Sequence, residues 1–389
     1  MNPSASARFQ LFIVRQYIGL LNFFLRIIQS ILFSRPLKNP KSILVYKVGN
    51  IGDIVCAIPC FIAIRRAYPD AKITLLTSTG TKSVPGAEDF LKGAWYFDEM
   101  KVYYSQDIDS WGKRTALAKT LRQNNYDLFI HIPAHDWTSF FTIIRNIFFA
   151  KMLGVKSAYG FQVRTVINLF WKTQIDYSLG EKEVDTLLDL LKEGGIKPVK
   201  PEFDFPISKE TEEKVSQFIR NKWQDSKAPL IAILAGSKRK YKEWQPEKFG
   251  EVAVYLQNKY GARFVILGNE KDIPDAEIIS RHLLKENALV VAGECSVPES
   301  IALTKQCDFF LGVDNGFMHI AAALGKPVVA LFCILNIYGK WFPYGEGHEC
   351  LYKRFLNCDY KNPECIKKSI EMISVDEVKA ACDRVISRL

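Results

Sequence analysis

The sequence has no acidic residue before Asp53, although 42 of its 389 residues are Asp or Glu. It also has no run of about 18 residues that is both uncharged and strongly apolar, so we expect no plain membrane-spanning helix. Internal repeats and low-complexity tracts are missing as well. These absences exclude repeat architectures and low-complexity chains as classes.

Zinc-binding cysteine pairs are also missing. The nine cysteines are spread along the chain, and Cys350, Cys358 and Cys365 do not have the C-x2-C spacing of zinc sites. We expect reduced, mostly buried thiols, as in a cytosolic protein, with a metal site at Cys350, Cys358 and Cys365 as the alternative.

What is present is typical of a large globular chain. Hydrophobic residues make up 48% and charged residues 24%, and the length favours two domains. The net charge of 52 − 42 = +10 indicates an anionic partner, or else a generally basic surface. No nucleic-acid-binding module or basic patch interleaved with aromatics occurs, so we expect no nucleic-acid partner.

Residues 11–33 are strongly apolar and predict an amphipathic helix. Arg15, Gly19, Asn22, Arg26 and Gln29 fall on one narrow face, and Leu, Ile and Phe fill the rest. Basic residues also flank the segment, at Arg8, Arg35 and Lys38. The pattern fits a helix lying in an anionic membrane surface, with the arginines toward phosphates. The alternative is a helix packed on the body of the protein.

From Lys41 onward the sequence predicts two parallel α/β domains. A strand over 42–46, a glycine turn, a helix over 53–68 and a strand over 72–77 form a first unit, which a strand over 127–132 extends. Strands over 230–234, 263–267, 288–291, 309–313 and 328–332 alternate with helices over 246–260, over 275–284 and from about 318. The proline-rich segment 196–208 reads as a linker. We expect a basic helix over 1–40, an acceptor domain over 41–203 and a donor domain over 204–389.

Each candidate motif follows a strand, where ligands bind in such sheets. Gly49 and Gly52 form a turn that presents Asp53 at the start of the next helix. Asp53 is either a capping aspartate or a general base for an acceptor hydroxyl. The turn does not have the G-x-G-x-x-G spacing, which disfavours a nicotinamide enzyme.

Two further motifs lie in the second domain. The loop after the strand over 230–234 holds Ser237 and Lys242 among four cations, which suits a diphosphate or else a solvated basic loop. The strand over 309–313 leads into Asp314, Asn315, Gly316 and His319, and a helix start here favours a phosphate. Asp314 is a candidate for sugar hydroxyls, and His319 is either a ligand contact or a core residue.

In this order the motifs resemble glycosyltransferase family 9, the ADP-heptose:lipopolysaccharide heptosyltransferases. The resemblance runs from about Lys41 to the C-terminus. It is carried by Gly52-Asp53 with Pro59, by Arg65-Arg66-x-Tyr68-Pro69, by Gly236-Ser237 with Lys242-x-Trp244, by Asp314-x-Gly316-x-Met318-His319 with the small residues up to Pro327, and by Trp341-x-Pro343-Tyr344-Gly345.

The resemblance implies a GT-B fold and an inverting, metal-independent transfer from a nucleotide-diphosphate sugar, without a cofactor. It implies that Asp53 is the general base. Ser237, Lys242, Asn315 and Gly316 would bind the donor diphosphate, Asp314 and His319 the donor sugar, and Glu270 the nucleoside. The implied acceptor is a glycolipid or oligosaccharide at the inner face of the cytoplasmic membrane, where the protein would make peripheral contact.

The sequence departs from the family pattern at three places. Ala57 and Ile58 replace the usual threonines, the D-S-G-P-M-H motif reads DNGFMH, and 333–336 read Cys-Ile-Leu-Asn instead of G-P-[ST]-[DN]. The last change leaves the donor open, so a transferase for another nucleotide sugar and a catalytically inactive, membrane-associated sugar-nucleotide binder are the alternatives. A nucleotide-sugar epimerase has the same fold but fits these motifs less well. The segment 137–153, rich in Phe and Ile, is either an acceptor-side surface or a buried helix.

Overall fold

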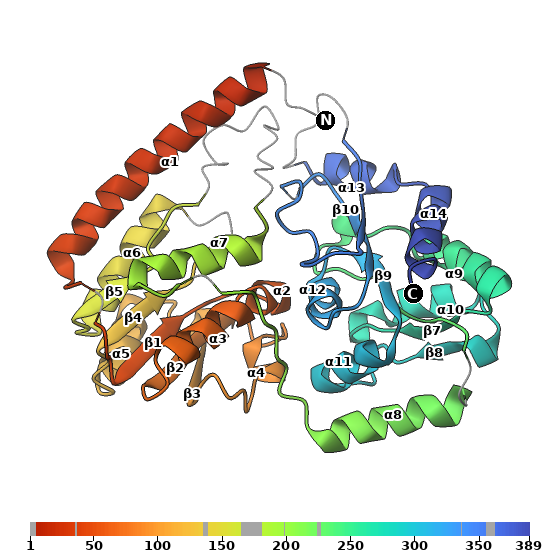
Figure 1. The fold of residues 1–389 in the computed structure, drawn as a ribbon, viewed down its shortest axis with the longest axis horizontal. Coiled ribbons are helices and arrows are strands. Elements are labelled where there is room, and N and C mark those ends of the chain that lie inside the picture. Colours follow the sequence, from red (N-terminus) through yellow and green to blue (C-terminus); the bar gives the residue numbers. More distant parts are fainter. Residues whose placement is uncertain are drawn as a thin grey trace. The chain divides into compact units, whose positions relative to one another are not determined.

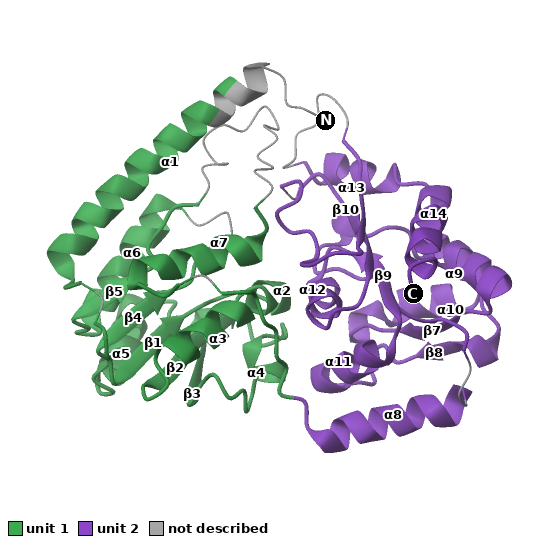
Figure 2. Cartoon of the chain, viewed as in Figure 1, with its two compact units in different colours: residues 1–206 green, residues 207–389 purple. Residues whose placement is uncertain are grey.

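A computed structural model describes residues 5–35, 37–134, 139–164, 181–197, 199–223, 227–335, 337–354 and 362–389. The chain forms two compact units, Met1–Pro206 and Ile207–Leu389, coloured separately in Figure 2. Each unit contains one sheet in which every strand pair is parallel.

The sheet of unit 1 has the strand order β3-β2-β1-β4-β5. Its strands are β1 Ser42–Tyr46, β2 Lys72–Gly80, β3 Glu99–Tyr104, β4 Leu128–His131 and β5 Ser157–Tyr159. The helices are α2 Ile51–Val55, α3 Ile58–Ala67, α4 Ala87–Phe90, α5 Trp111–Arg122, α6 Phe140–Met152 and α7 Glu183–Leu190. Strand β1 lies in the centre, and its continuous apolar run is buried on both faces, as expected of a central parallel strand.

Helix α1, Ala5–Leu32, packs along one side of unit 1 beside α6 (Figure 1). Leu25 is completely buried, and Asn22 and Gln29 donate hydrogen bonds to backbone carbonyls of Val163 and Ala158, at 3.0 and 2.9 Å. The structure therefore shows a helix packed on the body of the protein, the alternative that the sequence left open, and two members of the predicted narrow face, Asn22 and Gln29, turn inward. Buried backbone carbonyls need donors, and these two amides supply them.

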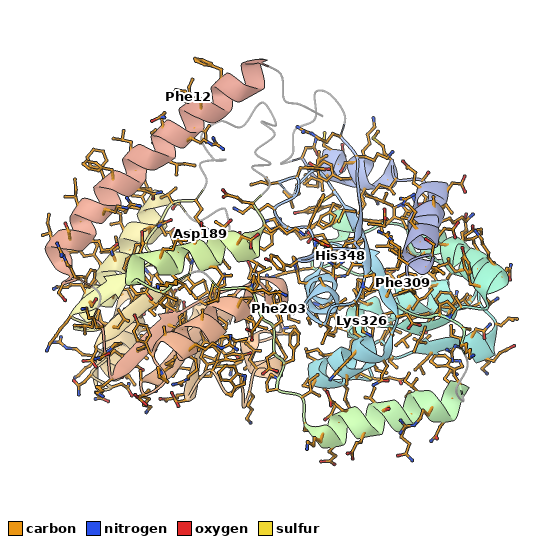
Figure 3. All side chains as sticks on the ribbon, in the orientation of Figure 1. Phe12, Asp189, Phe203, Phe309, Lys326 and His348 are labelled. Atoms are coloured by element: carbon orange, nitrogen blue, oxygen red, sulfur yellow. The ribbon has the colours of Figure 1, made fainter. Side chains whose placement is uncertain are left out.

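The sheet of unit 2 has the order β11-β10-β9-β6-β7-β8. Its strands are β6 Leu230–Leu234, β7 Arg263–Ile266, β8 Ala288–Val290, β9 Phe309–Val313, β10 Val328–Phe332 and β11 Glu349–Tyr352. The helices are α8 Lys209–Trp223, α9 Pro246–Tyr260, α10 Ile273–Ser280, α11 Val297–Gln306, α12 Gly316–Ala323, α13 Pro363–Glu371 and α14 Val375–Ile386. Strands β9 and β6 are neighbours in the middle, and Phe309, labelled in Figure 3, is buried in β9.

The predicted strands are confirmed to within a few residues, but two helices differ. The helix predicted over 53–68 is two helices, α2 and α3, because Pro59 starts a new helix at its second position and would clash inside a continuous one. The helix predicted over 275–284 begins at Ile273 and ends at Ser280. The sequence reading did not identify β3, β5 and β11, which are short or only half-buried edge strands.

Candidate functional site

In unit 1 the turn after β1 places the side chain of Asp53 close to the backbone of Gly49. Asp53 is the third residue of α2, and its carboxylate accepts the backbone N–H of the N-cap residue Asn50 at 3.0 Å, so the predicted capping contact is present. Gly49 has φ +149°, and a Cβ atom added there would lie 2.4 Å from the Cβ of Asp53. Only glycine therefore allows this turn, while Gly52 lies inside α2.

The protein environment shifts the pKa of Asp53 upward. Desolvation is the largest effect and raises the pKa to about 6, while the Lys47 charge and the Asn50 N–H act in the opposite direction. A carboxyl group with a pKa near 6 is ionised at neutral pH yet basic enough to accept a proton efficiently. This pKa suits the general base that the sequence predicts at Asp53, and the role stays a prediction.

Lys47 is the main residue at this edge that the sequence reading missed. It follows β1 directly, is fully buried, and its Nζ donates to the backbone carbonyls of Pro133 and Ala134 at 2.7 and 3.2 Å. Burial lowers its pKa, and the charges of Asp53 and Glu183 oppose that shift. A lysine directly after a central strand was the available sequence signal.

A buried ion pair lies in the same electrostatic neighbourhood. Arg164 and Glu183 are 2.7 Å apart, with side chains 5% and 2% exposed, and both affect the pKa values of Lys47 and Asp53. The two residues are far from β1 in sequence, so no local pattern could have linked them to Asp53. Together the four charged side chains form what we call the unit 1 cluster: Lys47, Asp53, Arg164 and Glu183.

In unit 2 the central feature is an ion pair between Lys242 and Asp314. Lys242 comes from the loop after β6 and Asp314 from the end of β9, and their side chains are only 14% and 10% exposed. Burial is the largest single effect on Lys242 and lowers its pKa, but the charge and hydrogen bond of Asp314, together with Cys333, raise that pKa overall. The structure thus joins two predicted site residues that are 72 positions apart in the sequence.

Asn315 connects the same two loops. Its side chain caps α12 by accepting the Met318 N–H at 3.0 Å, and its amide donates to the Gly236 carbonyl at 3.1 Å. Gly316 is the first residue of α12. Gly236 must be glycine, because an added Cβ would lie 2.1 Å from an Asp272 carboxylate oxygen.

The other predicted residues of unit 2 differ in their burial and contacts. Ser237 is half-buried, and its backbone N–H donates to Glu243 at 2.8 Å. Glu270 is exposed in the turn after β7, the strand next to β6. His319 is buried against Trp341, with ring centroids 6.0 Å apart, and desolvation lowers its pKa to about 4. A sugar contact by His319 stays a prediction.

No three His, Cys, Asp or Glu residues within the described ranges are grouped so that they could hold a metal ion. None of the eight described cysteines forms a disulfide, and Cys56, Cys60, Cys307, Cys333 and Cys382 are buried. Cys350 and Cys365 are partly exposed, and Cys358 lies outside the described residues.

The fold and these loops define a class: a two-unit α/β protein with charged residues at the carboxyl ends of central parallel strands. The model of glycosyltransferase family 9 (heptosyltransferase) matches residues 114–368. The chain therefore belongs to this family and is a glycosyltransferase.

Individual relatives agree with the family. A lipopolysaccharide heptosyltransferase 3 from Escherichia coli strain K12 is 24% identical over 352 residues, which cover 86% of this chain and 95% of that protein. A glycosyltransferase family 9 structure from Veillonella parvula has a TM-score of 0.72 at 19% identity, covering 92% of this chain and all of the other. E. coli ADP-heptose LPS heptosyltransferase II has a TM-score of 0.61 at 19% identity, covering 89% and 99%. These neighbours give the chain the GT-B fold.

Proposed function

We propose that this glycosyltransferase moves heptose from ADP-heptose to a lipopolysaccharide-core or other glycolipid acceptor. Membership of family 9 is the observation that carries the proposal. The relatives' names support the choice of donor and acceptor, since they include a lipopolysaccharide heptosyltransferase and an ADP-heptose LPS heptosyltransferase.

In the proposed reaction the acceptor hydroxyl oxygen attacks the anomeric carbon of the donor while the bond to the diphosphate breaks. Asp53 takes the hydroxyl proton, and ADP leaves from the opposite face, so the configuration inverts. A base with a pKa near 6 suits this step, because it is ionised before the reaction.

The residues of unit 2 are proposed to hold the donor. Lys242 and Ser237 bind the diphosphate, and Asn315 and Gly316 add donors at the start of α12, where the helix dipole favours an anion. Asp314 and His319 contact the donor sugar, and Glu270 the ribose. The ion pair with Asp314 keeps Lys242 charged and oriented before donor arrives.

The membrane context is part of the same proposal. We infer a cytoplasmic enzyme that makes peripheral contact with the inner face of the cytoplasmic membrane, where a glycolipid acceptor is anchored. Among the described residues, no helix is long and apolar enough to cross a bilayer.

The test measures ADP release from ADP-heptose with and without a Kdo-bearing lipid A acceptor. The wild-type chain should release ADP only with acceptor, and Asp53→Asn should lose at least about 100-fold in rate while still binding donor. Asp70→Asn, an exposed aspartate of the same unit, is the matched control and should keep full activity. Acceptor-dependent turnover that survives in Asp53→Asn would remove Asp53 as the base.

A second candidate uses another nucleotide sugar, because residues 333–336 differ from the family pattern. UDP- and GDP-sugars run beside ADP-heptose separate the two candidates. Release from one of these donors only would keep the mechanism and overturn heptose. A chain that binds a donor but never turns it over would be the inactive binder.

A further inference from the structure

The outward side of helix α1 carries large exposed apolar side chains from Phe12 to Ile31. Six large side chains stand on it with high exposure: Phe12 57%, Leu20 52%, Phe23 59%, Phe24 48%, Ile27 41% and Ile31 75%. We call these six residues the apolar face of α1. Figure 3 labels Phe12, which projects from the helix. Apolar surface gathered in this way is uncommon on a monomeric protein and marks an interaction site.

The packing of α1 fixes this face outward. The carbonyl and amide of Asn22 form two hydrogen bonds with the backbone of Val163, at 2.8 and 3.0 Å. Gln29 donates to Ala158, Leu25 is completely buried, and Lys151 donates to the Leu32 carbonyl at 2.9 Å. Because these contacts set the rotation of the helix about its axis, the apolar face cannot turn inward without breaking them.

Positive charge borders the apolar face. Arg15 and Arg26 are both exposed and lie 11 positions apart, about three turns, so they share one line along the helix. At about 100° per residue this line runs between the inward side and the apolar face. No acidic residue precedes Asp53 to neutralise them.

Helix α6 also exposes apolar side chains. Helix α6, which packs beside α1, exposes Phe141 at 81% and Phe148 at 54%, while Ile143 and Ile147 are buried. The reading of residues 137–153 as a buried helix therefore holds for one side of α6 only, and residues 137 and 138 lie outside the described residues. Two adjacent helices of unit 1 thus present phenylalanines to solvent.

We propose that the apolar face of α1 inserts into the interface of a bilayer that contains anionic lipids, with Arg15 and Arg26 at the level of the phosphates. The helix has 28 residues, about 42 Å at 1.5 Å per residue, and lies along the membrane surface. The inference rests on the proposed membrane contact and names the surface that makes it. Arginines beside an apolar strip match anionic headgroups, whereas a second copy of α1 would bring like charges together.

The test is flotation of the full-length chain with vesicles of phosphatidylcholine and phosphatidylglycerol, and with vesicles of phosphatidylcholine only. We expect binding to the anionic vesicles that weakens with added salt. Phe12→Gln combined with Phe23→Gln should weaken it at least about tenfold, since two large apolar side chains no longer leave water. Arg15→Gln with Arg26→Gln should remove the preference for anionic lipid.

The matched control removes two exposed aromatics elsewhere. Trp111→Gln with Phe218→Gln changes residues that are 72% and 47% exposed on α5 and α8, and should bind vesicles like the wild type. Equal vesicle binding by the α1 variant and this control would overturn the proposal. So would a lipid-free dimer that the α1 variant converts to monomer while vesicle binding is unchanged, because a second copy would then cover the face.

Activity separates this inference from the proposed function. The α1 variant should keep ADP release with a lipid-free oligosaccharide acceptor and lose it with acceptor embedded in vesicles. Loss with both acceptors would contradict a purely membrane-directed role. Vesicle flotation is read without turnover, so an inactive chain that still floats through α1 would overturn the transfer reaction and support the docking surface.

Discussion

At the scale of single residues, the acid–base properties of Asp53 decide how activity depends on pH. Desolvation raises its pKa to about 6, and a general base acts in its deprotonated form. Below pH 6, kcat/KM should therefore fall about tenfold per pH unit, and above it the profile should level off. A pH profile of acceptor-dependent ADP release measures this, and a profile that stays flat to pH 5 would contradict it.

The charge of Lys47 should affect the pH at which kcat/KM begins to fall. The charge of Lys47 lowers the pKa of Asp53, so Lys47→Met should raise that pKa. The fall of kcat/KM at low pH should then begin at a higher pH than in the wild type. Lys41→Met removes an exposed lysine from the opposite end of β1 and should leave the profile unchanged. An unshifted pH profile in a folded Lys47→Met protein would show that the two charges do not interact.

Gly49 has a backbone conformation that favours glycine, and it lies against the candidate base Asp53. Gly49→Ala should destabilise the chain by about 1–3 kcal/mol and lower kcat strongly, because the new Cβ displaces Asp53. Gly93→Ala is matched, since Gly93 also has a positive φ of +85° but open space around it. That control should cost about 1–2 kcal/mol and keep kcat. Urea unfolding and steady-state rates measure both effects.

At the scale of elements, only one side of helix α1 packs against the core of unit 1. Leu25→Ala should lower the free energy of unfolding by about 2–5 kcal/mol, because Leu25 is fully buried in the core that includes Phe129 and Phe161. The side chain of Leu20 is 52% exposed, so Leu20→Ala should change the free energy of unfolding by less than about 0.5 kcal/mol. Equal effects of the two substitutions in urea unfolding would mean that α1 is not anchored as described.

The elements also show where sequence reading succeeds. Central strands such as β1, β6, β9 and β10 are continuous apolar runs, and their bounds were predicted to the residue. Strand β11 is half-buried at the sheet edge and carries no such run, so it was missed. The division between α2 and α3 depends on Pro59, which the sequence contains but which the predicted continuous helix over 53–68 ignored.

At the scale of the whole molecule, the candidate residues fall on both units: Asp53 in unit 1, and Lys242 and Asp314 in unit 2. We therefore expect substitutions to separate catalysis from donor binding. Lys242→Met should weaken ADP-heptose binding about 10–100-fold, because a charge-assisted contact to the diphosphate is lost. Lys240→Met, in the same short turn but 69% exposed, should bind donor normally. Calorimetry with donor measures both.

Folding needs its own control, because removing one partner of a largely buried ion pair destabilises a protein by about 3–5 kcal/mol. Lys242→Met with Asp314→Asn removes both charges and should regain most of that stability. Donor binding should stay weak in the double variant. Donor affinity that returns with stability would show that Lys242 only supports the fold.

The sequence by itself determined the two parallel α/β units and the segments that carry Asp53, Lys242 and Asp314, because buried strands and glycine turns are local patterns. It also determined the apolar, basic character of α1. Only the tertiary structure decided that Lys242 pairs with Asp314, that Lys47 shares the surroundings of Asp53, and that Asn22 and Gln29 turn inward. Such contacts join residues far apart in the chain, and the burial that sets their pKa values exists only once the sheets have packed.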